Sequence, residues 1–262
     1  MSPQADEGHS HSHAADSAGV PWAGRSFEPN PHAGDDGSAD VALAAALMAR
    51  PEGGRDHTGI VDALRSARVL IPLVAEKGEE GVGAHGLVVD KTQELSIVTV
   101  AAPDGRTVMP VFSDVAAMSR WDRLARPVPA DARRAALAAA SEDTDLMVID
   151  PGSDTEYVVR RPAVWAIAQG HAWEPSWLSP EVATALHESI GTELAVLDVA
   201  VAPGDPSGRL RGSELVVRLD LMPGLDQTEL DAVLARLARR WAADDRIAVL
   251  ADSLSVKLIR GT

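Results

Sequence analysis

The sequence has no cysteine, few aromatic residues and no long apolar segment. Because all 262 residues lack a thiol, disulfide bonds and cysteine chemistry are excluded. No apolar run approaches the roughly 20 residues that span a bilayer, so we expect no membrane contact. Aromatic residues make up only 3% of the chain, so the occurrence of two tryptophans four residues apart, Trp173 and Trp177, needs an explanation.

Positive charge is also scarce, since 24 lysine and arginine residues face 39 aspartate and glutamate residues, for a formal net charge of −15. An acidic protein of this kind is not expected to bind nucleic acid or anionic membranes, because both need a basic surface. The first residues lack a basic region followed by an apolar one. We therefore expect no secretory signal and a cytoplasmic protein.

Residues 1–39 are rich in Ser, Asp, Gly, Pro and Ala and have little apolar surface to bury. Such a segment cannot recover the entropy that ordering costs, so we expect a disordered tail. Within it, His9, His11 and His13 alternate with other residues. Imidazoles in this pattern could bind a transition metal weakly, but a floppy chain lacks fixed ligand geometry. We favour an uncommitted polar tail and predict neither a metal site nor a cofactor.

Residues 40–172 predict an α+β domain. A capping aspartate, strong helix formers and a following proline indicate a helix over residues 40–50. A second short helix precedes a strand at residues 68–74, in which Pro72 suggests an edge position or a strand end. Residues 76–86 form a charged, glycine-rich loop, where glutamates argue against phosphate binding.

The centre of this domain is a predicted hairpin followed by a helix. Residues 95–100 and 107–112 predict two strands around an Asp-Gly turn, which is a strong hairpin signal. Ser113 is expected to cap the helix through its hydroxyl, and Asp114 favours the positive end of the helix dipole. This unit carries no visible chemistry.

The remainder of the domain adds an alanine-rich helix, two strands and a last helix that ends at Gly170. Between the strands, Asp150 and Asp154 flank a Pro-Gly turn. Two carboxylates could hold a metal or act in acid–base catalysis. Aspartate beside proline and glycine is ordinary turn chemistry, however, and we prefer that interpretation.

Residues 173–262 predict a second α+β domain. Its strands are expected at residues 192–201, 213–221, 246–250 and 255–259. Its best-marked helix begins at Asp226, where Glu229 is placed to complete a capping box. The chain should therefore consist of two small α+β domains, each with mixed sheets and helices packed on them, preceded by the tail.

Trp173 and Trp177 lie in the segment that joins the two domains. Each offers a large apolar area with one N–H donor, which suits either an interdomain seam or a surface for a partner. Because a linker crosses between domains, we favour the seam. We expect no catalytic residues.

Three stretches carry a resemblance to a known family: Ala67-Arg-Val-Leu-Ile-Pro72, Gly105-Arg-Thr-Val-Met-Pro-Val-Phe-Ser-Asp114 with Trp121 after it, and Leu146-Met-Val-Ile-Asp-Pro-Gly152. In these stretches the chain resembles the SseB-like family of bacterial proteins. Asp150 stands where that family usually has asparagine.

The resemblance covers about residues 40–170, and the C-terminal part looks like the companion domain of the same family. It implies no established activity, cofactor or catalytic residue. The sequence also lacks His-x-x-x-His pairs, a Gly-x-Ser-x-Gly motif and a dinucleotide fingerprint. We therefore expect a non-enzymatic interaction or regulatory protein that contacts a protein partner. The alternative is a small-ligand-binding protein or enzyme with an unrecognised pocket.

Overall fold

The computed structural model describes residues 32–75, 95–141, 144 and 146–260. Residues 35–262 cluster as one compact unit. The tail histidines His9, His11 and His13 and the loop at residues 76–86 lie outside the described residues. Among the residues that are described, no helix is both long enough and apolar enough to cross a membrane.

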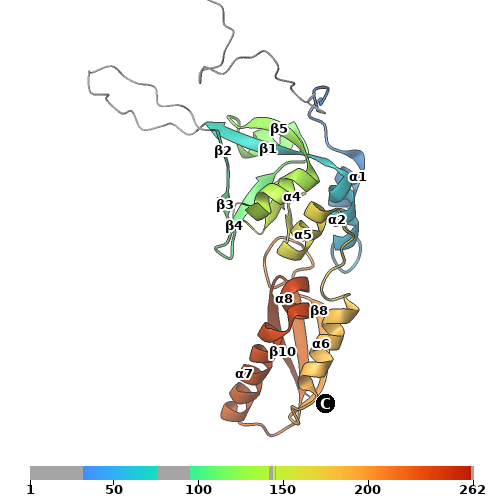
Figure 1. Cartoon of the computed structure of the whole chain (residues 1–262), viewed down its shortest axis with the longest axis vertical. Coiled ribbons are helices and arrows are strands. Elements are labelled where there is room, and N and C mark those ends of the chain that lie inside the picture. The colour runs from blue at the N-terminus through green and yellow to red at the C-terminus, as the bar shows by residue number, and fades with distance from the viewer. Residues whose placement is uncertain (1–31, 76–94, 142–143, 145, 261–262) are drawn as a thin grey trace, which may run out of the picture. The chain divides into compact units, whose positions relative to one another are not determined.

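Helices and strands alternate irregularly along the chain (Figure 1). The helices are α1 (Val41–Met48), α2 (His57–Ser66), α3 (Val115–Trp121), α4 (Ala132–Ser141), α5 (Arg161–Gln169), α6 (Pro180–Ile190), α7 (Gln227–Ala243) and α8 (Asp245–Leu250). The strands are β1 (Arg68–Ala75), β2 (Leu95–Ile97), β3 (Val100–Ala101), β4 (Thr107–Val111), β5 (Arg126–Asp131), β6 (Met147–Ile149), β7 (Tyr157–Val159), β8 (Val196–Pro203), β9 (Leu215–Leu221) and β10 (Leu254–Arg260). The predicted α+β class is confirmed, and the boundary between two domains stays a prediction.

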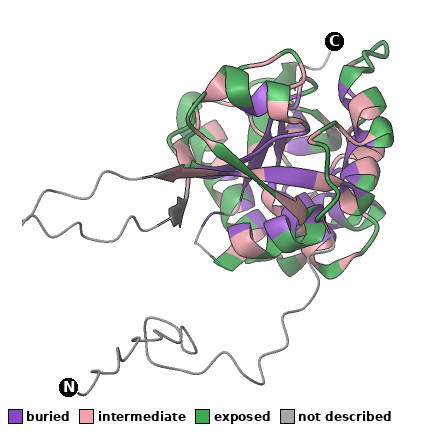
Figure 2. Cartoon of the chain, turned by 90° about the horizontal axis from the view of Figure 1, so that it is seen from above, coloured by how far each residue is buried: buried purple, intermediate pink, exposed green. Residues whose placement is uncertain are grey.

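The first half of the chain contains two small sheets. One has the order β2-β1-β5 and is antiparallel, and the other has the order β3-β4-β6-β7, in which β4 and β6 run parallel. A bridge between Leu70 and Phe112 links β1 to the end of β4. Helices α1, α2, α4 and α5 bury their apolar sides against these strands in one core. Figure 2 shows buried strand segments enclosed by helices with exposed outer sides.

The predicted hairpin is present but shorter than expected. Val100 pairs with Val108 across the turn, whereas residues 95–97 form β2 and pair with β1. The expected single strand over residues 95–100 is therefore wrong, because this segment passes from one sheet to the other. A local pattern cannot show such a change of partner, since both pieces are extended.

The start of α3 also differs from the expectation. Asp114, rather than Ser113, caps the helix and accepts a hydrogen bond from the N–H of Ala117 at 2.6 Å. The N–H and hydroxyl of Ser113 instead donate to the carboxylate of Asp150, at 2.8 and 2.7 Å. Both residue types are good caps, and only the tertiary position of Asp150 decides between them.

Pro72 lies inside the central strand β1, so both expected positions, a sheet edge and a strand end, are wrong. Its missing N–H is tolerated because the pairing with β2, on the side of β1 opposite to β5, covers only residues 73–75. The N–H of Leu70, two residues earlier, points to Phe112. Because N–H directions alternate along a strand, the proline faces the gap between Phe112 and β2.

The C-terminal sheet has the order β8-β9-β10, with β9 and β10 parallel. The predicted capping box at Asp226 and Glu229 is confirmed at the start of α7. The predicted strand at residues 246–250 is wrong, because this segment is the helix α8, capped by Asp244. A short apolar run fits a strand or a buried helix equally well, and here Ile247 joins the core below α6 and α7.

Candidate functional site

Trp173 and Trp177 are both half-buried, and each contacts a different apolar core. Trp173 packs against the core of the first half of the chain, and Trp177 packs against the core of the C-terminal sheet. Both line the same cavity, whose volume is only about 10 Å³. Ligand sites are usually far larger, at roughly 300–1,000 Å³, and this space suits one water molecule.

The same cavity is bordered by His57 from α2 and Tyr157 from β7. The Nδ1 atom of His57 lies 3.0 Å from the Tyr157 hydroxyl, and the edge of the imidazole meets Trp177 at a centroid distance of 5.1 Å. The Nε2 atom of His57 is buried and has no hydrogen-bond partner among the described residues. Burial lowers the pKa of His57 and raises the pKa of Tyr157. Both rings are therefore neutral near pH 7.

A charged network extends from this cavity. The Arg160 guanidinium donates to the carboxylates of Asp205 and Asp252, both at 2.9 Å, and Arg106 donates to Asp252 at 2.8 Å. Burial alone would raise the pKa of Asp252, but hydrogen bonds from Arg106 and Arg160 hold it below its usual value. The charges neutralise one another, and this favours a structural role for the network.

Beside this network, the carboxylate of Glu214 accepts hydrogen bonds from the N–H groups of Ser176 and Asp252. Burial raises the pKa of Glu214. Sequence reasoning missed the whole arrangement, because its members come from the β3–β4 turn, the start of α5 and two later loops. No local pattern marks them.

Asp150 and Asp154 lie in a turn, as the sequence predicts. The Asp150 carboxylate is buried and accepts hydrogen bonds from Ser113 and Thr155. The side chain of Asp154 is exposed. Among the described residues, no group of three or more His, Asp or Glu side chains is arranged to hold a metal ion.

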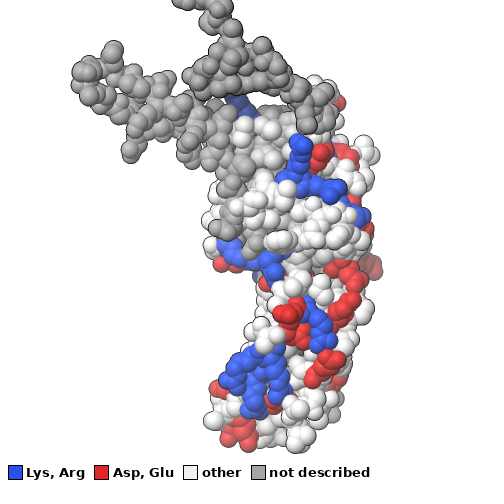
Figure 3. All heavy atoms as spheres, in the orientation of Figure 1, with Lys and Arg blue, Asp and Glu red and all other residues white. Residues whose placement is uncertain are grey.

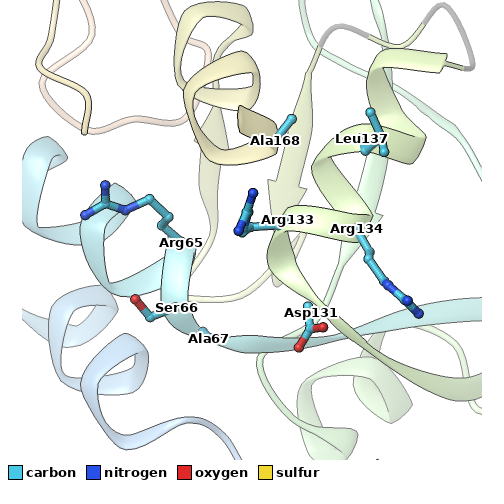
Figure 4. Close-up of a pocket in the computed structure, with 8 residues that line it drawn as sticks. All are labelled: Arg65, Ser66, Ala67, Asp131, Arg133, Arg134, Leu137 and Ala168. Carbon is cyan, nitrogen blue, oxygen red and sulfur yellow. The ribbon is translucent and has the colours of Figure 1, made fainter. Parts of the chain in front are cut away.

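One surface hollow of about 480 Å³ lies between α2, α4 and α5 and is lined by Arg65, Arg133 and Arg134. The side chains of Arg65 and Arg134 extend to opposite sides, and Arg133 lies between them, so the three guanidinium groups do not converge (Figure 4). Arg65 pairs with Asp62 at 3.0 Å. Arg133 lies over Gly170 at the C-terminal end of α5, where the helix dipole favours a cation. This hollow does not focus positive charge on a ligand.

An apolar surface lies at the open edge of the C-terminal sheet. Val256 and Leu258 of β10 are the register neighbours of Val217 and Leu219 of β9, so all four side chains lie on one face. Val217 and Leu219 are 0% exposed beneath the helices, whereas Val256 and Leu258 are 38% and 39% exposed. The helix layer therefore covers β9 and Leu254 at the start of β10, but it leaves Val256 and Leu258 partly exposed.

A hollow of about 500 Å³ continues this surface. It is lined mainly by apolar side chains at the end of the sheet and the start of α7, namely Leu221, Met222, Pro223, Leu225, Leu230, Leu258 and Ile259. We call Val256, Leu258 and this hollow the β10 shelf. Figure 3 shows that a basic patch lies over α7, but Arg236 and Arg240 of that helix share the carboxylate of Glu193.

The comparisons with known proteins identify one family. The SseB protein N-terminal domain matches residues 42–166, which hold both sheets of the first half of the chain. No curated protein and no solved structure matches the chain.

Proposed function

The chain is an SseB-like family protein, and on that premise we propose that it acts through protein–protein contacts, by binding an extended segment of a partner along β10. The observation that supports this proposal is the difference in exposure between β9 and β10. Apolar side chains on one sheet face are completely buried on β9 and more than a third exposed on β10. An added strand would cover them.

The backbone of β10 also favours an extended partner segment as the occupant of this edge. Among the described strands, β10 pairs only with β9, so its outer N–H and C=O groups have no strand partner. The strand contains no proline. Unpaired edges of this kind accept an extended peptide, in which main-chain hydrogen bonds supply affinity and alternate side chains supply specificity.

The charges beside the edge define the chemistry of the partner. Lys257 of β10 and Arg218 of β9 are register neighbours and both are exposed. Neither forms an ion pair within the described part of the chain. A partner strand that alternates apolar and acidic residues would place the apolar ones on the β10 shelf and the acidic ones beside these cations.

The test is selection of short random peptides displayed against the full chain, followed by affinity measurement on the selected sequences. We expect extended peptides with alternating apolar and acidic residues, and slower amide hydrogen exchange in β10 when they bind. Val256→Asp and Leu258→Asp should weaken binding about tenfold or more. Val249→Asp is the matched control, because Val249 is 63% exposed on α8 and lies outside the shelf.

Two results would overturn the proposal. Peptides that bind Val256→Asp and the parent protein equally well would place the partner elsewhere. A dimer of the parent chain, measured by light scattering and broken by Val256→Asp, would make a second copy the occupant of β10.

A further inference from the structure

Three arginines surround a hollow of about 410 Å³ on the first half of the chain and the β8–β9 loop. They are Arg50 after α1, Arg55 before α2 and Arg209 in the loop. We call them the arginine triad. The rest of the lining is uncharged and consists of Pro51, Gly53, Gly54, Pro206 and Ser207.

The triad converges on backbone carbonyls. The carbonyl oxygen of Asp154 accepts hydrogen bonds from Arg50 at 2.6 Å, from Arg209 at 3.1 Å and from Arg55 at 3.2 Å. A carbonyl oxygen has two lone pairs, so three guanidinium groups exceed what it can accept well. Arg50 and Arg55 also share the carbonyl oxygen of Leu47.

The Glu156 carboxylate acts on Arg55 through its charge but forms no ion pair with the triad. In the described part of the chain, none of the three guanidinium groups lies within ion-pair distance of an acidic side chain. Elsewhere, clustered arginines share carboxylates, as Arg106 and Arg160 share Asp252. The contrast is sharp in a chain whose formal net charge is −15.

Burial of Arg55 makes the missing ion pair costly. Arg55 is only 8% exposed, and its ring neighbour Tyr157 offers the guanidinium a π face rather than a negative charge. Burial and the charges of Arg50 and Arg209 lower the pKa of Arg55. A guanidinium still keeps its proton at neutral pH, so the cost has to be offset by an anion instead of by deprotonation.

We propose that the arginine triad binds a phosphoryl group, either on a small phosphorylated molecule or on a phosphorylated side chain. Planar guanidinium groups bind phosphate oxygens through paired hydrogen bonds, and a dianion satisfies more donors than one carbonyl oxygen can. The volume of the hollow accommodates a phosphoryl group together with part of the molecule that carries it. This site is separate from the β10 shelf and does not depend on it.

The test is calorimetric titration of the full chain with inorganic phosphate at constant ionic strength. We expect saturable binding of one phosphate that weakens as sodium chloride is raised. Arg50→Gln and Arg209→Gln should each weaken it about tenfold or more, because each removes a charge-assisted donor. Arg239→Gln is the matched control, since Arg239 is an exposed arginine on α7 and the change in net charge is identical.

Two further titrations distinguish the source of the phosphoryl group. Tighter binding of phosphoserine or phosphotyrosine peptides than of phosphate indicates a modified protein, and tighter binding of nucleotides or sugar phosphates indicates a small molecule. The proposal is overturned if phosphate shows no saturable binding, or if Arg239→Gln weakens it as much as Arg209→Gln does. It is also overturned if the triad variants only lower the melting temperature, equally with and without phosphate. The arginines would then merely hold the turn at Asp154 against α1.

Discussion

Arg160 donates a hydrogen bond of 2.9 Å to Asp252, although the two residues lie 92 positions apart in the sequence. The same guanidinium holds Asp205, and the side chains of all three residues are at most 8% exposed. The start of α5 is thereby tied to the β8–β9 loop and to the residue pair before β10. Because these charges are excluded from water, they stabilise the fold only while they remain together.

Arg160→Met should therefore be strongly destabilising. Arg106 would still pair with Asp252, but Asp205 would be left buried without its cation. We expect a loss of about 3–5 kcal/mol in the free energy of unfolding, measured by urea denaturation at neutral pH. Arg65→Met, which breaks a surface pair with Asp62 that is 47% exposed, should cost about 0–1 kcal/mol. A loss in Arg160→Met as small as that of the surface pair would contradict a structural role for the network.

Trp177→Ala distinguishes the interdomain seam from a partner surface. Trp177 packs on the C-terminal core and meets His57 edge-on. If it belongs to a seam, the variant should lose roughly 3 kcal/mol in the free energy of unfolding, the lower end of the range for removing a buried aromatic. Trp165→Ala, at a tryptophan that is 48% exposed, should cost less. Unchanged stability with loss of a bound protein would favour the partner surface.

His57 should make the stability of the fold depend on pH. Burial lowers the pKa of the folded imidazole below its ordinary value of 6.5, so the unfolded chain binds the proton more tightly. The free energy of unfolding should then fall as the pH is lowered through 6.5 towards the folded pKa. His57→Asn should remove this slope, whereas the same change at the exposed His171 should keep it. A slope that persists in His57→Asn would assign it to another group.

Residues 40–172 expressed alone should fold. The core of the first half and the core of the C-terminal sheet are built from different residues, as expected for separable domains. The fragment should unfold cooperatively, but with a lower melting temperature than the full chain, because Arg106 and Arg160 lose Asp252. A molten or insoluble product would instead indicate a single shared folding unit.

The sequence predicted most of the local structure where one residue pattern had one physical meaning. The capping box at Asp226 and Glu229 is present because both partners lie within one helical turn. The predictions of secondary structure and helix caps were wrong where one residue pattern fitted two local structures. Residues 246–250 fit a strand or a short helix, and Ser113 and Asp114 were both suitable caps.

Composition and periodicity by themselves determined the α+β class, the absence of thiol chemistry and the capping box of α7, because hydrophobic periodicity and helix capping act over a few neighbouring residues. Only the tertiary structure decided which charges meet. It placed Arg160 on Asp205 and Asp252, and it brought Arg50, Arg55 and Arg209 together with no ion pair in the described part of the chain. Electrostatic partners come from distant loops, and their distances are set by how the sheets and helices pack, which no local pattern records.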